Sequence, residues 1–574
     1  MKNASKQQGM WDILIPILLT IVVLPLAVRL AIYSCGYSGY EWYSVNDTLT
    51  DFYCYYKGYF LDIIGIFAGI ILAFRLALYR EKTKGMKLFI PLAVYCVFIL
   101  LSTIFSINAD ASLKGNFESF ESCIVLIVYV ILALYAYQIM ESERDYRYIW
   151  YAILVISAIF AVIGTFQIFG YDLMNFEWVQ QLIMTEEQFS LYRGEIEDTF
   201  TGNNVYLTLY NPNYAGVTLC MLFAVIWTMA LSETRKKIRI FWFVCSAVML
   251  TLIWFTYSRA SLLAALMILV LGTIKFLKQK KHLLIGIAGI IALFAVFICI
   301  DAALDFKYLS RIADKNTREP LTAMTTDENG IHMTYDGTEY CLYLENDTLL
   351  CVTDAMETPL ITAEGHEMSL PFESGAEAVF YENEIYLYVA ENTLNFIHED
   401  DMYYYITPSM APAQMISVEA TDFHGLEYLG SARGYIWSRT LPLLKDHIFI
   451  GSGPDTFAEV FPQHDYAGKV VYSDRPDMII EKAHNDYLTK WVQTGGISVL
   501  CILVFYILFI KKGIHGYAQI DDMRTRLGFG CYLACLSFMF TSLFNDSTLQ
   551  TSPFFWVFAG IALSSIYSKN KGLS

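Results

Sequence analysis

Four short polar stretches interrupt an otherwise apolar sequence, and each contains residue types that could do chemistry. Asn211 and Asn213 flank a proline in the first stretch, and Ser258 and Arg259 form the second. Polar side chains are costly beside a lipid bilayer, so they often mark functional sites there. The guanidinium of Arg259 would suit a phosphate ligand, because it stays charged and can donate two parallel hydrogen bonds.

The other two polar stretches lie in the last third of the chain. The third contains Arg433 and Arg439 and ends in a turn rich in glycine, and the fourth contains His484, Asn485 and Asp486. A neutral imidazole can take a proton from a hydroxyl group near pH 7. Structural roles are also open, since asparagines cap helices and interfacial arginines reach for lipid headgroups.

The elements that must position these residues are apolar helices. The chain has 574 residues, of which 56% are hydrophobic and 17% charged, a balance that excludes an ordinary soluble domain. The sequence predicts an all-α polytopic membrane protein with about twelve transmembrane helices, the first of them a retained helix without a clear cleavage site. The apolar segments are 12–34, 58–79, 88–107, 121–140, 148–169, 214–231, 240–257, 260–277, 283–304, 492–510, 527–544 and 554–568.

Lysines and arginines gather in alternate loops, which indicates the cytoplasmic side of the membrane. This distribution predicts that both termini are cytoplasmic and that two long loops, 170–213 and 305–490, lie outside. The loops rich in cations are 80–87, 144–147, 235–239, 275–281 and 511–526.

The second long loop contains a strongly acidic insert. Residues 315–425 hold 21 Asp and Glu against only Lys315 and Arg318, which accounts for the net charge of −17 of the whole chain. Such acidity is typical of a solvated surface. Within the insert, residues 329–406 alternate polar and apolar residues between Asn-Asp and Asp-Gly steps. This pattern predicts a small antiparallel β domain, which could bind glycan, bind a protein partner or cap the membrane domain.

Sequence motifs for cofactors are not found in this chain. It contains neither a nucleotide-binding glycine loop nor a Cys/His spacing that would hold a metal, so no cofactor and no metal are expected. Two pairs of cysteines, Cys35 with Cys54 and Cys341 with Cys351, could form disulfides in an oxidising compartment.

Taken together and in this order, the four polar stretches resemble the O-antigen ligase and polymerase family of the WaaL/Wzy type. The resemblance covers residues from about 200 to 300 and from about 430 to 570, whereas the acidic insert departs from the compact form of the family. The matching parts are Asn211-Pro-Asn-Tyr214, Ser258-Arg259, the Arg433 to Trp437 stretch that leads into Gly451-Ser-Gly-Pro-Asp-Thr-Phe457, and Ala483-His-Asn-Asp-Tyr-Leu488.

The resemblance implies a GT-C-like glycosyltransferase in the bacterial cytoplasmic membrane, acting at the outer face. Such enzymes move a glycan from an undecaprenyl-pyrophosphate carrier to a hydroxyl of a lipid, cell-wall polymer or protein acceptor, without a nucleotide, a metal or a nucleic acid. The implied architecture is a membrane domain over 1–304, an extracytoplasmic loop with the β-rich insert over 305–428, a catalytic-type loop over 429–491 and a second membrane part over 492–574.

The resemblance also implies a role for each candidate residue. Arg259 and Arg433 would bind the pyrophosphate, and His484 would orient or deprotonate the attacking hydroxyl. The remaining residues are expected to shape the cavity, orient the histidine or bind substrate: Asn211, Asn213, Ser258, Arg439, Asn485 and Asp486.

Three alternatives stay open. A polymerase of the same family would add the glycan to another lipid-linked repeat unit. A polysaccharide or lipid transporter would show paired broken helices and ionisable residues near the bilayer midplane. A sensor or scaffold would use the β domain to bind a ligand and would leave His484 and Arg259 without a role.

Overall fold

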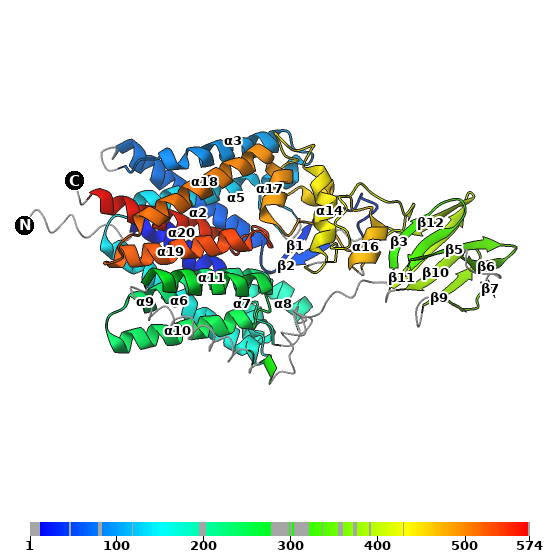
Figure 1. Ribbon diagram of the computed structural model, residues 1–574, viewed down its shortest axis with the longest axis horizontal. Helices are drawn as coiled ribbons and strands as arrows, with labels where there is room; N and C mark the ends of the chain where they lie inside the picture. Colours follow the sequence, from blue (N-terminus) through cyan, green and yellow to red (C-terminus); the bar gives the residue numbers. More distant parts are fainter. Residues whose placement is uncertain are drawn as a thin grey trace, which may run out of the picture.

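The structure is a computed structural model that describes residues 12–44, 48–78, 83–116, 119–193, 203–276, 298, 301–302, 321–335, 337–353, 360–370, 376–389, 392–428, 430–473 and 475–571. The helix predicted over 283–304 lies outside these ranges except for residues 298, 301 and 302. Within the described residues the chain is mostly helical, and two β-sheets gather at one end of the molecule (Figure 1).

Long helices run side by side in one bundle (Figure 1). Among the described residues, seven helices are long and apolar enough to cross a membrane, in agreement with the predicted membrane character. They span Tyr55–Leu78 (α2), Lys87–Ile104 (η5 and α3), Glu143–Ile168 (α6), Pro212–Ser232 (α9), Lys236–Trp254 (α10), Arg259–Phe276 (α11) and Gly496–Gly516 (α18).

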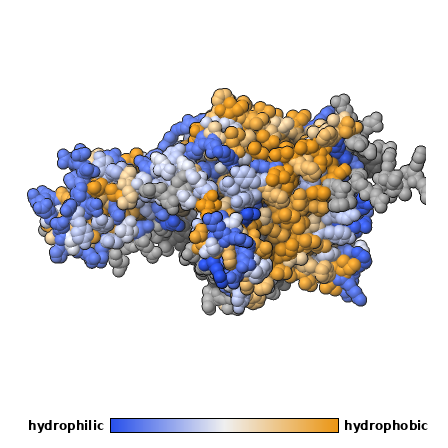
Figure 2. All heavy atoms as spheres, turned by 180° about the vertical axis from the view of Figure 1, so that it is seen from behind, coloured by the Kyte–Doolittle hydropathy of each residue, from blue (hydrophilic) through white to orange (hydrophobic). Residues whose placement is uncertain are grey.

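Three further helices, Cys123–Ile139 (α5), Met523–Thr541 (α19) and Ser552–Lys571 (α20), fill the centre of the bundle. Helix α19 packs against α9 and α20, and α20 packs against α5. On the face shown in Figure 2, hydrophobic side chains form a belt around the bundle, with hydrophilic side chains at both ends. Such a belt is the surface expected where a helix bundle contacts lipid.

The first apolar segment does not form one helix over residues 12–34 as predicted. It is helical only from Asp12 to Leu26, through 3-10, α (Ile15–Leu18, α1), π and 3-10 turns. Residues Ala31–Ser34 (β1) instead pair antiparallel with Thr48–Asp51 (β2). Pro25 lacks an amide donor and disfavours further helix, and a short apolar run has no period that separates strand from helix.

Two antiparallel sheets confirm the predicted β-rich insert. In one hairpin of the predicted pattern, Asn346 and Asp347 have φ of 49° and 57° and turn the chain between paired residues Glu345 and Thr348. The five-stranded sheet joins Leu321–Thr326 (β3), Ile331–Tyr335 (β4), Thr338–Glu345 (β5), Thr348–Val352 (β6) and Leu360–Ala363 (β7) in that order. The six-stranded sheet joins Pro412–Ala413 (β13), Met402–Ile406 (β12), Asn392–Glu399 (β11), Glu384–Val389 (β10), Glu377–Tyr381 (β9) and Met368–Ser369 (β8).

Among the short helices, Arg433–Leu443 (α14) and Tyr466–Ser473 (α16) lie between the bundle and the sheets (Figure 1). The Tyr466 ring of one of them packs on Tyr405 of β12, with ring centroids 5.0 Å apart. Neither of the two cysteine pairs that could have formed disulfides is disulfide-bonded. The short helices are Ala109–Lys114 (α4), Glu177–Ile183 (α7), Glu186–Tyr192 (α8), Arg433–Leu443 (α14), Phe457–Val460 (α15), Tyr466–Ser473 (α16) and Asp486–Thr494 (α17).

Helices α9 and α11 approach each other closely at Gly216. A methyl group there would overlap the Ser261 hydroxyl, whereas a methyl group at Gly69 of α2 meets only ordinary contacts at 3.8 Å. We expect Gly216→Ala to lower the free energy of unfolding by about 1 kcal/mol through overpacking, and Gly69→Ala to have little effect. Thermal unfolding in detergent measures both. Equal melting temperatures for the two variants would contradict the close packing of α9 on α11.

Candidate active site

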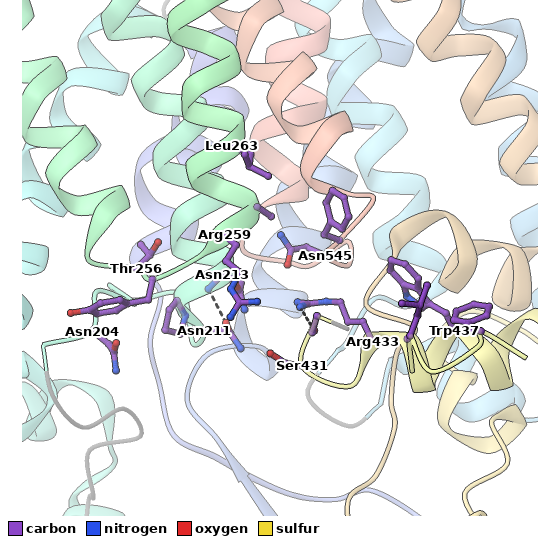
Figure 3. A pocket seen from close by; sticks show the side chains of 18 residues that line it. Asn204, Asn211, Asn213, Thr256, Arg259, Leu263, Ser431, Arg433, Trp437 and Asn545 are labelled. Carbon is purple, nitrogen blue, oxygen red and sulfur yellow. Dashed lines mark hydrogen bonds between the residues drawn. The ribbon is translucent and has the colours of Figure 1, made fainter. Parts of the chain in front are cut away.

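One cavity of about 670 Å³ lies at the end of the bundle that faces the sheets. Four segments far apart in sequence meet around it: the starts of α9, α11 and α14, and the loop between α19 and α20 (Figure 3). The lining includes Arg259 and Arg433, two of the three predicted arginines, and both predicted asparagines of the first stretch. The polar residues around it are Asn204, Asn211, Asn213, Thr256, Tyr257, Arg259, Ser431, Arg433, Trp437 and Asn545.

The side chains of Arg259 and Arg433 point toward each other across this cavity (Figure 3). Arg433 donates from Nη1 to the Gly430 carbonyl at 2.8 Å, and its buried Nε has no hydrogen-bond partner. Burial, together with the facing Arg259, holds the pKa of Arg433 below its usual range. Two facing guanidinium groups repel each other, so the arrangement favours an anion between them.

Both arginines follow residues whose backbone is in the left-handed conformation. Ser431 and Ala432 both have φ of 60° immediately before Arg433, and Tyr257 has φ of 53° two residues before Arg259. Such conformations cost free energy for residues other than glycine, and they cluster where side chains must be held in place for function. The chain therefore enters α14 and α11 through sharp turns that place an arginine on the cavity at the first turn of each helix.

Amide side chains complete the polar wall. Asn211 accepts from the Asn213 amide at 2.8 Å and caps the start of α9, so the capping role that the sequence left open is present. Asn545 is buried beside the cavity, and its Nδ2 has no hydrogen-bond partner. A buried amide donor without a partner is costly unless a ligand accepts its hydrogen bond.

His484 is paired with a carboxylate that the sequence analysis did not single out. Its Nδ1 lies 2.8 Å from Oδ2 of Asp546, whose side chain is 1% exposed against 40% for the histidine. The other carboxylate oxygen accepts from the Thr489 hydroxyl at 3.2 Å. Since a carboxylate can only accept, the proton of a neutral imidazole here sits on Nδ1 and leaves the lone pair of Nε2 for a general base.

The charge of Asp546 is supported by its surroundings. Burial alone would raise the pKa of Asp546, but His484 and Lys482 lower it overall. His484 itself has φ of 49°, another left-handed position of a residue other than glycine. The pair is therefore an oriented imidazole backed by a buried carboxylate.

Two connections fix this pair beside the cavity. Trp437 lines the cavity and donates from Nε1 to the Ala483 carbonyl at 2.8 Å, next to His484. On the other side, Asn545 lines the cavity and is the chain neighbour of Asp546. The histidine does not itself line the cavity, but its chain neighbour Ala483 and its partner Asp546 connect it to lining residues.

The other predicted residues do not line the cavity. Ser258 accepts from the Ser261 hydroxyl at 2.9 Å at the start of α11. Asn485 caps α17 by accepting from the Tyr487 and Leu488 amides.

Two more predicted residues form ion pairs away from the cavity lining. Asp486 pairs with Lys490 within α17. Arg439 donates from Nε to Asp465 at 2.9 Å and lies over the Tyr435 ring, on the far side of α14 from the cavity-lining residues. These contacts give both side chains a structural role.

Among the described residues, no group of three or more His, Cys, Asp or Glu is placed to hold a metal ion. Comparison with models of known protein families found no match, and comparison with curated proteins found none either.

We expect Asp546→Asn to lower the free energy of unfolding at neutral pH by about 1.5 to 3 kcal/mol, because a charged hydrogen bond is lost. The pKa of Asp546 is lowered on folding, so its contribution is present above the ordinary carboxyl pKa and disappears as the pH falls through the lowered value. The difference in melting temperature between wild type and variant should therefore shrink in acid. Asp446→Asn, at an exposed carboxylate, is the matched control. A difference that grows with falling pH would contradict an ionised Asp546.

Proposed function

We propose that this protein is an integral membrane glycosyltransferase of the O-antigen ligase type. It moves a glycan from an undecaprenyl-pyrophosphate carrier to a hydroxyl group of an acceptor. The observation that carries the proposal is one cavity with two facing arginines, Arg259 and Arg433, beside the His484–Asp546 pair. A cation pair suits a diphosphate, and an oriented imidazole suits a hydroxyl nucleophile.

Each of these groups has its own role in the reaction. The acceptor oxygen attacks the anomeric carbon of the donor sugar while its proton passes to Nε2 of His484. The bond from that carbon to the phosphate oxygen breaks, and the bonding electrons leave with undecaprenyl pyrophosphate. Arg259 and Arg433 stabilise the negative charge that develops on the leaving phosphate, and Asp546 stabilises the imidazolium. The energy comes from the diphosphate leaving group, so no nucleotide is consumed.

The proposal includes a placement in the membrane. Helix ends that carry the basic loops lie opposite the sheets, as the hydrogen bond from Lys275 of α11 to Ala518 after α18 illustrates. The positive-inside rule then makes this end cytoplasmic and puts the cavity and the β-rich insert on the outer side. Both termini would be cytoplasmic, with about twelve spans in a GT-C-like fold of the bacterial cytoplasmic membrane.

The same cavity has an apolar side for the carrier lipid. Leu263 of α11 and Phe544 after α19 line it and are 52% and 36% exposed on the bundle surface. Exposed apolar side chains at a cavity mouth are suited to the isoprenoid chain of a lipid that enters from the bilayer. The diphosphate would then reach the arginines at headgroup level.

Purified protein supplied with undecaprenyl-pyrophosphate-linked glycan and candidate acceptors tests the proposal, with mass spectrometry following the donor and the product. We expect the donor to be consumed and undecaprenyl pyrophosphate to be released. The product mass separates a ligase from a polymerase, because a polymerase adds whole repeat units to a lipid-linked chain. An intact donor in the presence of every acceptor, together with passage of the same glycan across vesicle membranes, would instead establish a transporter.

A further inference from the structure

A second cavity of about 350 Å³ lies at the opposite end of the bundle from the candidate active site. It opens between η5 and the ends of α5, α18 and α20. The predicted transferase chemistry does not use it. It is lined by Gly85, Lys87, Leu88, Tyr137, Leu508, Lys512, Leu563, Ile566 and Tyr567.

The charged part of this lining is entirely basic. Lys87 and Lys512 line the cavity, both are exposed, and none of the nine lining residues is acidic. A third lysine, Lys84, is buried behind Tyr137 and donates from Nζ to the Tyr137 carbonyl at 2.6 Å and to the Met140 carbonyl. Three ammonium groups on or next to one cavity favour an anionic ligand.

The rest of the lining is apolar and aromatic. Leu508 of α18 and Leu563 and Ile566 of α20 form one side. The Tyr137 and Tyr567 rings meet edge to face at 6.0 Å, and the Tyr137 hydroxyl donates to the Gly85 carbonyl at 3.0 Å. The cavity is therefore an amphipathic cleft, with cations at the helix ends and hydrocarbon surface along the helices.

We infer that this cleft binds an anionic phospholipid of the inner leaflet. The headgroup phosphate lies between Lys87 and Lys512, and an acyl chain follows Leu508, Leu563 and Ile566 between α18 and α20. Basic pockets between helices on the cytoplasmic side are suited to anionic headgroups, and the inner leaflet supplies them. The inference rests on this lining and on the basic loops, and it does not depend on the reaction proposed for the other cavity.

Lipid binding to the full-length protein in detergent tests the inference, with native mass spectrometry counting bound lipids and thermal unfolding reporting stabilisation. The probes are phosphatidylglycerol, phosphatidylcholine and inorganic phosphate. We expect phosphatidylglycerol to bind and stabilise, with little effect of the other two. The double variant Lys87→Gln/Lys512→Gln should bind phosphatidylglycerol about tenfold more weakly or worse, and should unfold like wild type without lipid.

Lys236→Gln/Lys237→Gln is the matched control, because it removes two exposed lysines from the start of α10, at the same end but outside the cleft. It should keep wild-type binding. An equal loss of phosphatidylglycerol binding in both double variants would mean that general surface charge causes the binding, and it would overturn the proposed site. Equal stabilisation by phosphatidylcholine, or by inorganic phosphate alone, would overturn the assignment to an anionic phospholipid.

Discussion

His484→Ala should lower the turnover number for glycan transfer by about 100- to 10,000-fold, the range expected when a general base is lost. Binding of the lipid-linked donor should change little, because the arginines that bind its diphosphate remain. Transfer kinetics at saturating donor, together with donor binding, separate the two effects. His464→Ala, at an exposed histidine in the turn before α16, should keep wild-type turnover.

Asp546, the partner of His484, provides a second test of the pair. Asp546 acts through His484 at 2.8 Å, so it is a positioning residue. Asp546→Asn should reduce turnover and also alter its pH dependence, because an amide can donate to Nδ1 and favour the wrong tautomer. A variant that loses turnover only in proportion to lost folded protein, with an unchanged pH profile, would make the carboxylate purely structural. Wild-type turnover in His484→Ala would show that this histidine is not the general base.

Arg433→Gln should lower kcat/KM by about 100-fold or more, since a cation that stabilises the leaving phosphate is lost. The same change should leave the melting temperature of the ligand-free protein equal or higher. Arg433 faces Arg259 and holds a buried Nε without a partner, so its removal relieves repulsion and desolvation. Arg259→Gln should lower kcat/KM in the same way. A loss of activity with a gain of stability is characteristic of a binding residue and not of a structural one.

Arg439 provides the matched contrast within the same helix. Its side chain is 13% exposed and is ion-paired with Asp465, which is 2% exposed. Arg439→Gln removes the ion pair of that buried carboxylate, which keeps the hydrogen bond from the Gly468 amide, so the protein should be destabilised by up to about 3 kcal/mol. The folded fraction should keep its kcat/KM. If Arg433→Gln destabilises and Arg439→Gln does not, the assignment of the two arginines is reversed.

The difference between these two arginines shows where sequence reasoning reached its limit. Both lie in one polar stretch, six positions apart, and nothing in their spacing tells which one faces a cavity. The answer depends on Ala432, whose left-handed backbone starts the helix at Arg433, and on Asp465, which approaches Arg439 from the turn before α16. Local pattern predicts that arginines are present in a helix, whereas their partners are set by tertiary packing.

Asp546 could have been found from the sequence by the criterion used for Ser258 and Arg259. It belongs to a polar run, residues 545–548, between the apolar segments 527–544 and 554–568. Its pairing with His484, 62 positions earlier, could not have been found, because it depends on how the loop after α19 folds against α17. Conversely, Asn-Asp turn signals sufficed to predict the β-rich insert, since hairpin turns are encoded locally.

The most direct test of the central claim is a structure of the His484→Ala variant in lipid nanodiscs with undecaprenyl-pyrophosphate-linked glycan bound. Removal of the base should trap the donor before transfer. The predicted result is diphosphate density between Arg259 and Arg433, with the anomeric carbon of the first sugar toward position 484. Diphosphate bound elsewhere, with the cavity between the two arginines left to solvent, would contradict the assignment of this cavity as the transferase site.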